Sequence, residues 1–184
     1  MVAVLETFDL FREAKRKSDL TKKLRTKGYS ISAKLDIPDI NEDNKPYCFM
    51  VDEINKKWFL ANYKASYAEA FDYYDIADYR ITYRLIGTAV VKGKKFSGSY
   101  SEFADTKTKI LDIVELNSKN CEYIDFSITY RGKALYAHLC DKFVLFENQQ
   151  GNFIYAKNHD FVTPSHSISN AKEFENLLFQ IVSK

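Results

Sequence analysis

The chain has 184 residues, of which 46% are hydrophobic and 28% charged, and its formal net charge is +2. This composition excludes a disordered or low-complexity protein, and the length fits one ordinary domain that needs no disulfide or metal for stability. The near-neutral charge gives no sign of a polyanionic partner. With 13 Tyr and 14 Phe, the composition also favours strands, since rings pack well on pleated surfaces.

The cysteines, Cys48, Cys121 and Cys140, are odd in number and widely spaced, which indicates reduced thiols rather than a disulfide framework. The N-terminus lacks the basic and apolar regions of a signal peptide, and no run reaches the ~18 apolar residues of a membrane span. We therefore expect a cytoplasmic protein without a membrane partner.

Residues 7–27 predict a helix, because Gly28 follows a basic last turn where helices commonly end. Four apolar residues within an arc of about 120° on this helix predict a buried stripe. They are Leu10, Ala14, Leu20 and Leu24. Ser18 and Asp19 leave open a division into two shorter helices.

Residues 29–35 alternate in polarity and predict a short strand, and residues 36–46 predict a linker. The linker carries two prolines, four acidic residues and two asparagines. It divides the chain into a basic helical arm at 1–35, the linker at 36–46 and a body at 47–184.

The body begins with a predicted hairpin, in which strands at 47–51 and 57–63 flank a turn at 52–56. A helical turn is expected at 65–70, and residues 135–139 and 143–146 fit either helix or strand. The further predicted strands are at 78–86, 88–91, 109–116, 122–130 and 153–156, with a turn at 117–120.

An amphipathic helix is predicted at the C-terminus, ending near Val182. Ser169 or Asn170 is suited to cap it, and Glu173 lies where a capping-box acid would follow Asn170. The apolar residues at helical spacing are Ala171, Phe174, Leu177, Leu178 and Ile181.

The order of these elements resembles small bacterial pleckstrin-homology-like (PH-like) domains over about residues 47–183. The resemblance lies in Phe49-Met-Val-Asp-Glu, in Trp58 on the returning strand, and in Tyr74-Asp75-Ile76 before a long strand. It implies an α+β, mostly β fold: a bent antiparallel β sandwich or barrel plugged by the C-terminal helix. In similar bacterial proteins a zinc ribbon or short helical module often precedes the domain, and here the basic arm stands in its place.

No motif for metal binding or catalysis is present. A zinc site needs about four ligands, commonly in close pairs, and the neighbours His138 and Cys140 have no partner pair. Cys140 with His159 or His166 is a combination that any chain with three Cys and three His offers. We therefore expect no catalytic residue, no metal and no cofactor.

The basic arm is the feature that indicates a binding surface. Eight basic residues lie between positions 12 and 27 against two acidic ones, a local net charge of +6, so the remainder carries −4. Four of the eight project within about 60° of one another on a continuous helix, opposite the leucine stripe. They are Arg12, Arg16, Lys23 and Lys27.

A row of cations suits a phosphate backbone or an acidic protein groove. Three interpretations stay open: a solvated outer face, contact with an acidic or nucleic-acid-handling protein, and direct binding of nucleic acid. The net acidic body and the lack of a nucleic-acid-binding motif favour a protein over nucleic acid as the partner.

The sequence thus indicates a non-enzymatic protein-interaction module of the PH-like type. The alternative is a small inhibitor, of a kind that phages encode, which binds a nucleic-acid-processing host complex through its basic surface. An enzyme is a third class, which no motif supports. The first predicted hairpin carries Asp52 and Glu53 beside Lys56 and Lys57, so it forms no cationic cradle for membrane phosphoinositides.

Overall fold

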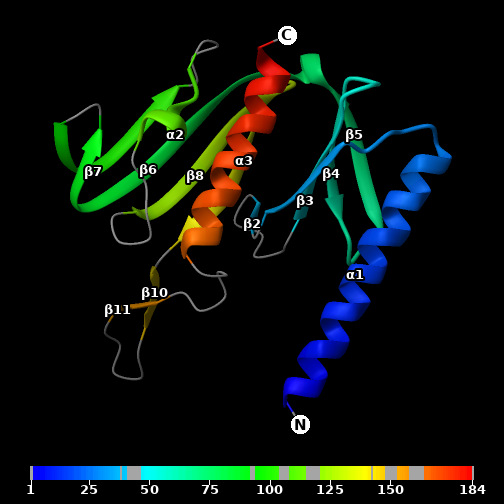
Figure 1. Ribbon diagram of the computed structural model, residues 1–184, viewed down its shortest axis with the longest axis horizontal. Coiled ribbons are helices and arrows are strands. Elements are labelled where there is room, and N and C mark those ends of the chain that lie inside the picture. Colours follow the sequence, from blue (N-terminus) through cyan, green and yellow to red (C-terminus); the bar gives the residue numbers. More distant parts are fainter. Residues whose placement is uncertain are drawn as a thin grey trace. The chain divides into compact units, whose positions relative to one another are not determined.

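The protein is mostly β, with a helix at each end of the chain, which confirms the predicted α+β class (Figure 1). The computed structural model describes residues 2–37, 39–40, 47–91, 94–103, 108–114, 121–141, 143–147, 153–157 and 164–183, some of them by backbone alone. The chain forms two compact units. The first comprises Met1–Ile37 and Pro46–Tyr73, and the second comprises Pro38–Lys45 and Tyr74–Lys184.

This division differs from the expected arm, linker and body. The N-terminal helix belongs to the same compact unit as four strands, so it is not a separate arm. The predicted linker at 36–46 contributes Asp36 and Ile37 to one strand and Asp39–Ile40 to another, while 38 and 41–46 lie outside the described residues.

The first unit consists of the helix α1 (Val2–Thr26) and one antiparallel sheet with the strand order β1-β3-β4-β5. The helix is continuous through Ser18 and Asp19, so the two-helix alternative is wrong. The strands of this sheet are β1 (Ala33–Ile37), β3 (Tyr47–Asp52), β4 (Lys57–Asn62) and β5 (Tyr67–Asp72).

Two successive turns of the same design connect β3 to β4 and β4 to β5. In each, a side-chain oxygen at the first position accepts a backbone hydrogen bond, from Asn55 N–H to Asp52 and from Ala65 N–H to Asn62. In each, the last turn residue has a positive φ, 53° at Lys56 and 50° at Ser66. The predicted hairpin is thus confirmed. The helical turn expected at 65–70 is wrong, because residues 67–70 pair with β4 as part of strand β5.

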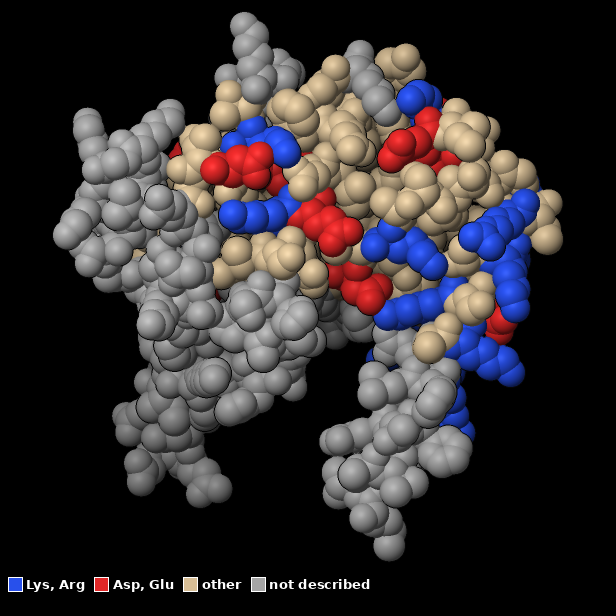
Figure 2. Space-filling view, viewed as in Figure 1, with Lys and Arg blue, Asp and Glu red and all other residues tan. Residues whose placement is uncertain are grey.

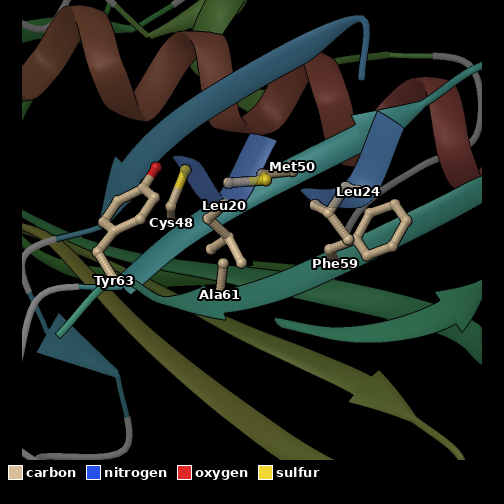
Figure 3. Packing of buried hydrophobic residues seen from close by; sticks show 7 residues of the cluster. All are labelled: Leu20, Leu24, Cys48, Met50, Phe59, Ala61 and Tyr63. Atoms are coloured by element: carbon tan, nitrogen blue, oxygen red, sulfur yellow. The ribbon is translucent and has the colours of Figure 1, made fainter. Parts of the chain in front are cut away.

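The core of the first unit lies between α1 and one face of its sheet. Alternate residues of β3 and β4 point to this face and meet two leucines of the helix (Figure 3). The buried cluster consists of Leu20, Leu24, Cys48, Met50, Phe59, Ala61 and Tyr63. Burying each leucine contributes roughly 1.5–3 kcal/mol, which fixes the C-terminal half of α1 on the sheet.

The other face of the same sheet carries a row of stacked rings. The Trp58 ring lies between those of Phe49 and Phe71, with centroids 5.4 Å and 4.2 Å away. The indole N–H of Trp58 donates to the carbonyl of Asp72 at 3.0 Å. The alternation that places Phe59 toward α1 therefore places Trp58 on the opposite face.

The second unit contains a five-stranded antiparallel sheet, in the order β2-β9-β8-β6-β7, and a separate hairpin of β10 and β11. Its strands are β2 (Asp39–Ile40), β6 (Ile76–Val91), β7 (Lys94–Phe103), β8 (Cys121–Tyr130), β9 (Lys133–Asp141), β10 (Phe143–Glu147) and β11 (Phe153–Lys157). A one-turn 3-10 helix, η1 (Tyr73–Asp75), precedes β6. None of the described sheets is closed, so the barrel detail of the expected fold is not confirmed.

The helix α3 (Pro164–Val182) contacts β9 and β6 and the short helix α2 (Ile110–Ile113). As predicted, its apolar residues are buried, with Phe174 and Leu178 fully inaccessible and the Phe174 ring 5.0 Å from that of Phe126. The predicted caps are wrong. Because α3 begins at Pro164, Ser169 and Asn170 lie inside it.

Four other expectations differ from the structure. The strand predicted at 29–35 begins at Ala33, and the strands predicted at 78–86 and 88–91 are the single strand β6. The strand predicted at 109–116 is wrong, because α2 occupies Ile110–Ile113. Strand β7 was not predicted at all. The turn at 117–120 lies outside the described residues, whereas 135–139, 143–146 and 153–156 are strands.

Candidate interaction surface on α1

The four cations predicted to bind a partner are all exposed in the structure. Arg12, Arg16 and Lys23 lie on α1, and Lys27 follows its last residue. Figure 2 shows Lys and Arg side chains gathered over this helix. We call these four residues the first row.

The end of the helix is fixed by a glycine cap. Gly28 has a φ of 88°, its N–H donates to the carbonyl of Arg25, and the N–H of Tyr29 donates to that of Leu24. These two bonds are those of a Schellman motif, in which the residue after the glycine also packs back on the helix. Tyr29 packs against the buried cluster that contains Leu20 and Leu24 of the helix, with its ring 4.9 Å from that of Phe59 on β4. The cap keeps Lys23 and Lys27 on a helical end of defined geometry.

Lys17 is not part of the exposed surface. Its ammonium lies 2.6 Å from an Asp36 carboxylate oxygen and 5.0 Å from the centre of the Tyr63 ring. Thr21 lies one turn later on the same side of the helix, and its hydroxyl donates a hydrogen bond to the carbonyl of Lys17. Lys17 therefore joins α1 to β1 and to the end of β4.

The buried side of α1 differs from the predicted stripe. It comprises Leu20, Thr21 and Leu24 with the half-buried Lys17, whereas Ala14 is exposed and the Leu10 side chain lies outside the described residues. At 100° per residue, the first row lies about 100° around the helix from this side. It is beside the sheet-facing side, not opposite it as predicted, because the predicted stripe is itself centred only about 110° around the helix from the first row.

The positive charge of the first unit is concentrated in the segment 12–27. The segment 12–27 has a net charge of +6, while the whole first unit has +3, so the rest of the unit is net −3. Asp19 is the single acidic residue between positions 14 and 27. The positive electrostatic potential that attracts an acidic group is therefore confined to this segment, because the rest of the unit is net negative.

The buried thiol of Cys48 does not form a catalytic centre. Burial raises its pKa to about 12, although a hydrogen bond with Tyr63 acts in the opposite direction. Figure 3 shows the Tyr63 ring beside this thiol. A nucleophilic cysteine needs a lowered pKa, so Cys48 is a protonated core residue.

The other residues considered for chemistry do not come together among the described residues. Nδ1 of His138 lies 2.7 Å from a carboxylate oxygen of Asp125 on the neighbouring strand. The side chains of Cys140, His159 and His166 lie outside the described residues. Within the part of the chain that is described, no three Cys, His, Asp or Glu residues are placed to hold a metal ion.

Glu175 is a buried carboxylate that the sequence pattern did not single out. Its two oxygens accept the backbone N–H groups of Ile110 and Leu111, the latter at 2.7 Å. Burial raises its pKa, although these hydrogen bonds counteract the effect. Because both oxygens are occupied by the first turn of α2, the group is structural.

No protein-family model, no curated protein and no solved structure matches this chain. In the described residues, no helix has the length and apolar character needed to cross a membrane.

Proposed function

We propose that this protein is a non-enzymatic interaction module of the PH-like type that binds an acidic protein partner through the first row. The observation that carries the proposal is the exposure of Arg12, Arg16, Lys23 and Lys27 on one side of a helix that Leu20 and Leu24 hold on a sheet. A cationic surface on a fixed helix is suited to steer and orient an acid-rich partner.

The PH-like part of the proposal is supported by the succession of antiparallel strands that ends in a helix packed on a sheet. The cytoplasmic location is supported by Cys48 and Cys121, which are buried thiols and not disulfide-bonded in the part of the chain that is described, as suits a reducing compartment. An inhibitor of a nucleic-acid-processing complex would use the same surface, and the identity of the captured partner distinguishes it from a general interaction module.

The test is a quadruple variant in which each residue of the first row becomes Gln. Wild type and variant are compared for melting and for partners captured from cell lysate at low and moderate salt, with and without nuclease treatment. We expect an unchanged fold, because exposed single charges contribute little to stability, and a loss of partners. Binding by wild type should weaken with salt.

A matched control replaces four exposed lysines elsewhere, with the same change of charge. These are Lys34, Lys56, Lys64 and Lys133. The control should keep the partners. Equal capture by the first-row variant and wild type at both salt concentrations would refute the proposal, and loss of the partner on nuclease treatment would assign the surface to nucleic acid.

A further inference from the structure

The outward side of α1 carries a second row of cations, which consists of Lys15, Lys22 and Arg25. All three are exposed. At 100° per residue they fall within an arc of about 80°, centred about 120° from the first row. The row is not part of the predicted site, because that prediction took only the cations that share one narrow arc.

The two rows flank the outward side of the helix. From the sheet-facing side, the first row lies about 100° around the helix in one direction and the second row about 140° in the other. Between the rows lie Asp19 and Thr26, both exposed. With 1.5 Å per residue, the first row extends over about 22 Å and the second over about 15 Å of the same helix.

We propose that the acidic partner receives α1 in an acid-lined groove, with the first row on one wall and the second row on the other. This rests on the proposed function and adds three binding residues and the shape of the partner. A flat surface reaches one flank of a helix that is about 10–12 Å wide, whereas a groove reaches both. Cations on both flanks therefore match two acidic walls.

The charge distribution favours a protein groove over the groove of a nucleic acid duplex. The first unit outside segment 12–27 is net −3, and Glu53 and Glu69 are exposed there. A long polyanion that continues past the helix is repelled by this remainder. An acidic groove that encloses only residues 12–27 avoids this repulsion.

The experiment measures binding of a fluorescently labelled poly-glutamate peptide, long enough to follow both rows, to the full chain at low salt. The second-row variant carries Gln at Lys15, Lys22 and Arg25. Its matched control carries Gln at Lys34, Lys56 and Lys64, which are exposed on the same unit. We expect one peptide per protein and an affinity about threefold or more lower for the second-row variant than for the control, since each exposed ion pair changes an equilibrium constant by roughly 1.4- to 5-fold.

Equal affinity of the second-row variant and its control for the peptide would overturn the proposed groove. Binding of two peptides per protein would also overturn it, as would a failure of wild type to bind the peptide. The first-row variant separates the two proposals. If only the first-row variant binds the peptide more weakly than wild type, the proposed function is supported and the groove is refuted. If neither variant binds more weakly, both proposals are refuted. A duplex DNA of equal charge that binds wild type more tightly than the peptide would also overturn the inference.

Discussion

The buried carboxylate of Asp52 accepts a hydrogen bond from the backbone N–H of Ser30, at 2.7 Å, and thereby joins the segment after α1 to the turn between β3 and β4. It also accepts the backbone N–H groups of Ile54 and Asn55 and the side-chain amide of Asn55. That amide donates in addition to the carbonyl of Gly28. One carboxylate thus fixes the end of the helix that carries the basic surface.

The first prediction is that Asp52→Ala lowers the free energy of unfolding by about 2–4 kcal/mol, because three backbone N–H groups and one side-chain amide lose a buried, charged acceptor. Urea unfolding measures this difference. The exposed neighbour Glu53 provides the control, since Glu53→Ala should change stability by less than about 0.5 kcal/mol. Equal effects of the two substitutions would show that Asp52 has no special role.

The same carboxylate predicts a pH dependence. Burial alone would raise the pKa of Asp52, but the hydrogen bonds outweigh it and lower the pKa below its ordinary value of 3.8. Its contribution to stability is therefore present above pH 3.8 and is lost as the pH falls toward the lower folded-state pKa. Wild type should lose more stability than Asp52→Asn between about pH 5 and pH 3. Parallel stability curves would contradict this.

The glycine cap of α1 gives the second prediction. A Cβ atom at Gly28 would contact nothing within 4 Å, so the cost of Gly28→Ala comes from its φ of 88° alone. We expect a loss of about 1 kcal/mol for Ala and less for Asn, which tolerates positive φ better. Thermal melting of the two variants checks the order. A Gly28→Ala variant as stable as wild type would contradict the importance of the cap.

The accuracy of the sequence predictions depended on whether the relevant contacts are local. The end of α1 at Gly28 and the turn at Asp52 follow from neighbouring residues, and both were predicted. Strand β7 is rich in Ser and Lys and exists because it pairs with β6. The first turn of α2 is held by Glu175, which is 64 residues beyond Leu111, so no local pattern indicates it.

The prediction of the binding surface was also accurate only for what local spacing determines. The pattern of cations predicted that the first row is exposed, because helical spacing is local. It placed this row opposite the buried side, although at 100° per residue the predicted stripe is centred only about 110° from it. The contacts of Lys17 with Asp36 and Tyr63 join residues far apart in the sequence, so no local pattern indicates them. Helical spacing also places Lys15, Lys22 and Arg25 on a second row, and the structure shows that all three are exposed.

The third prediction concerns Phe174, a fully buried residue of α3 whose ring lies beside that of Phe126. Phe174→Ala should lower the free energy of unfolding by about 3–5 kcal/mol, through lost burial and the cavity left behind. Chemical unfolding measures it, with exposed Glu173→Ala as the control on the same helix. A cooperative Phe174→Ala variant with an unchanged melting temperature would mean that α3 is peripheral.

The fourth prediction concerns the unpaired hydroxyl of Tyr79. The residue is fully buried, and its hydroxyl has no hydrogen-bond partner among the described residues. Because an unsatisfied buried polar group costs roughly 1–3 kcal/mol, Tyr79→Phe should stabilise the protein or leave it unchanged. Thermal melting checks this. A lower melting temperature for Tyr79→Phe would reveal that the hydroxyl has a partner, such as a buried water.

The last prediction follows from Glu175, whose carboxylate holds the first turn of α2. Burial raises its pKa above the ordinary value of 4.5, so the folded state retains the proton to higher pH than the unfolded chain. For such an acid, stability falls as the pH rises from 4.5 through the folded-state pKa. Glu175→Gln removes this titration, so wild type should lose stability relative to the variant between about pH 4 and pH 7.

The comparison uses urea unfolding at both pH values, with Glu173→Gln on the exposed side of α3 as the control. The control should follow the pH dependence of wild type, because Glu173 does not contact α2 through a buried carboxylate. At neutral pH, Glu175→Ala should cost about 2–4 kcal/mol, since the N–H groups of Ile110 and Leu111 then have no acceptor. If Glu175→Gln and wild type keep a constant difference from pH 4 to pH 7, the pKa of Glu175 is not raised. If Glu175→Ala is as stable as wild type, the link between α2 and α3 does not depend on this carboxylate.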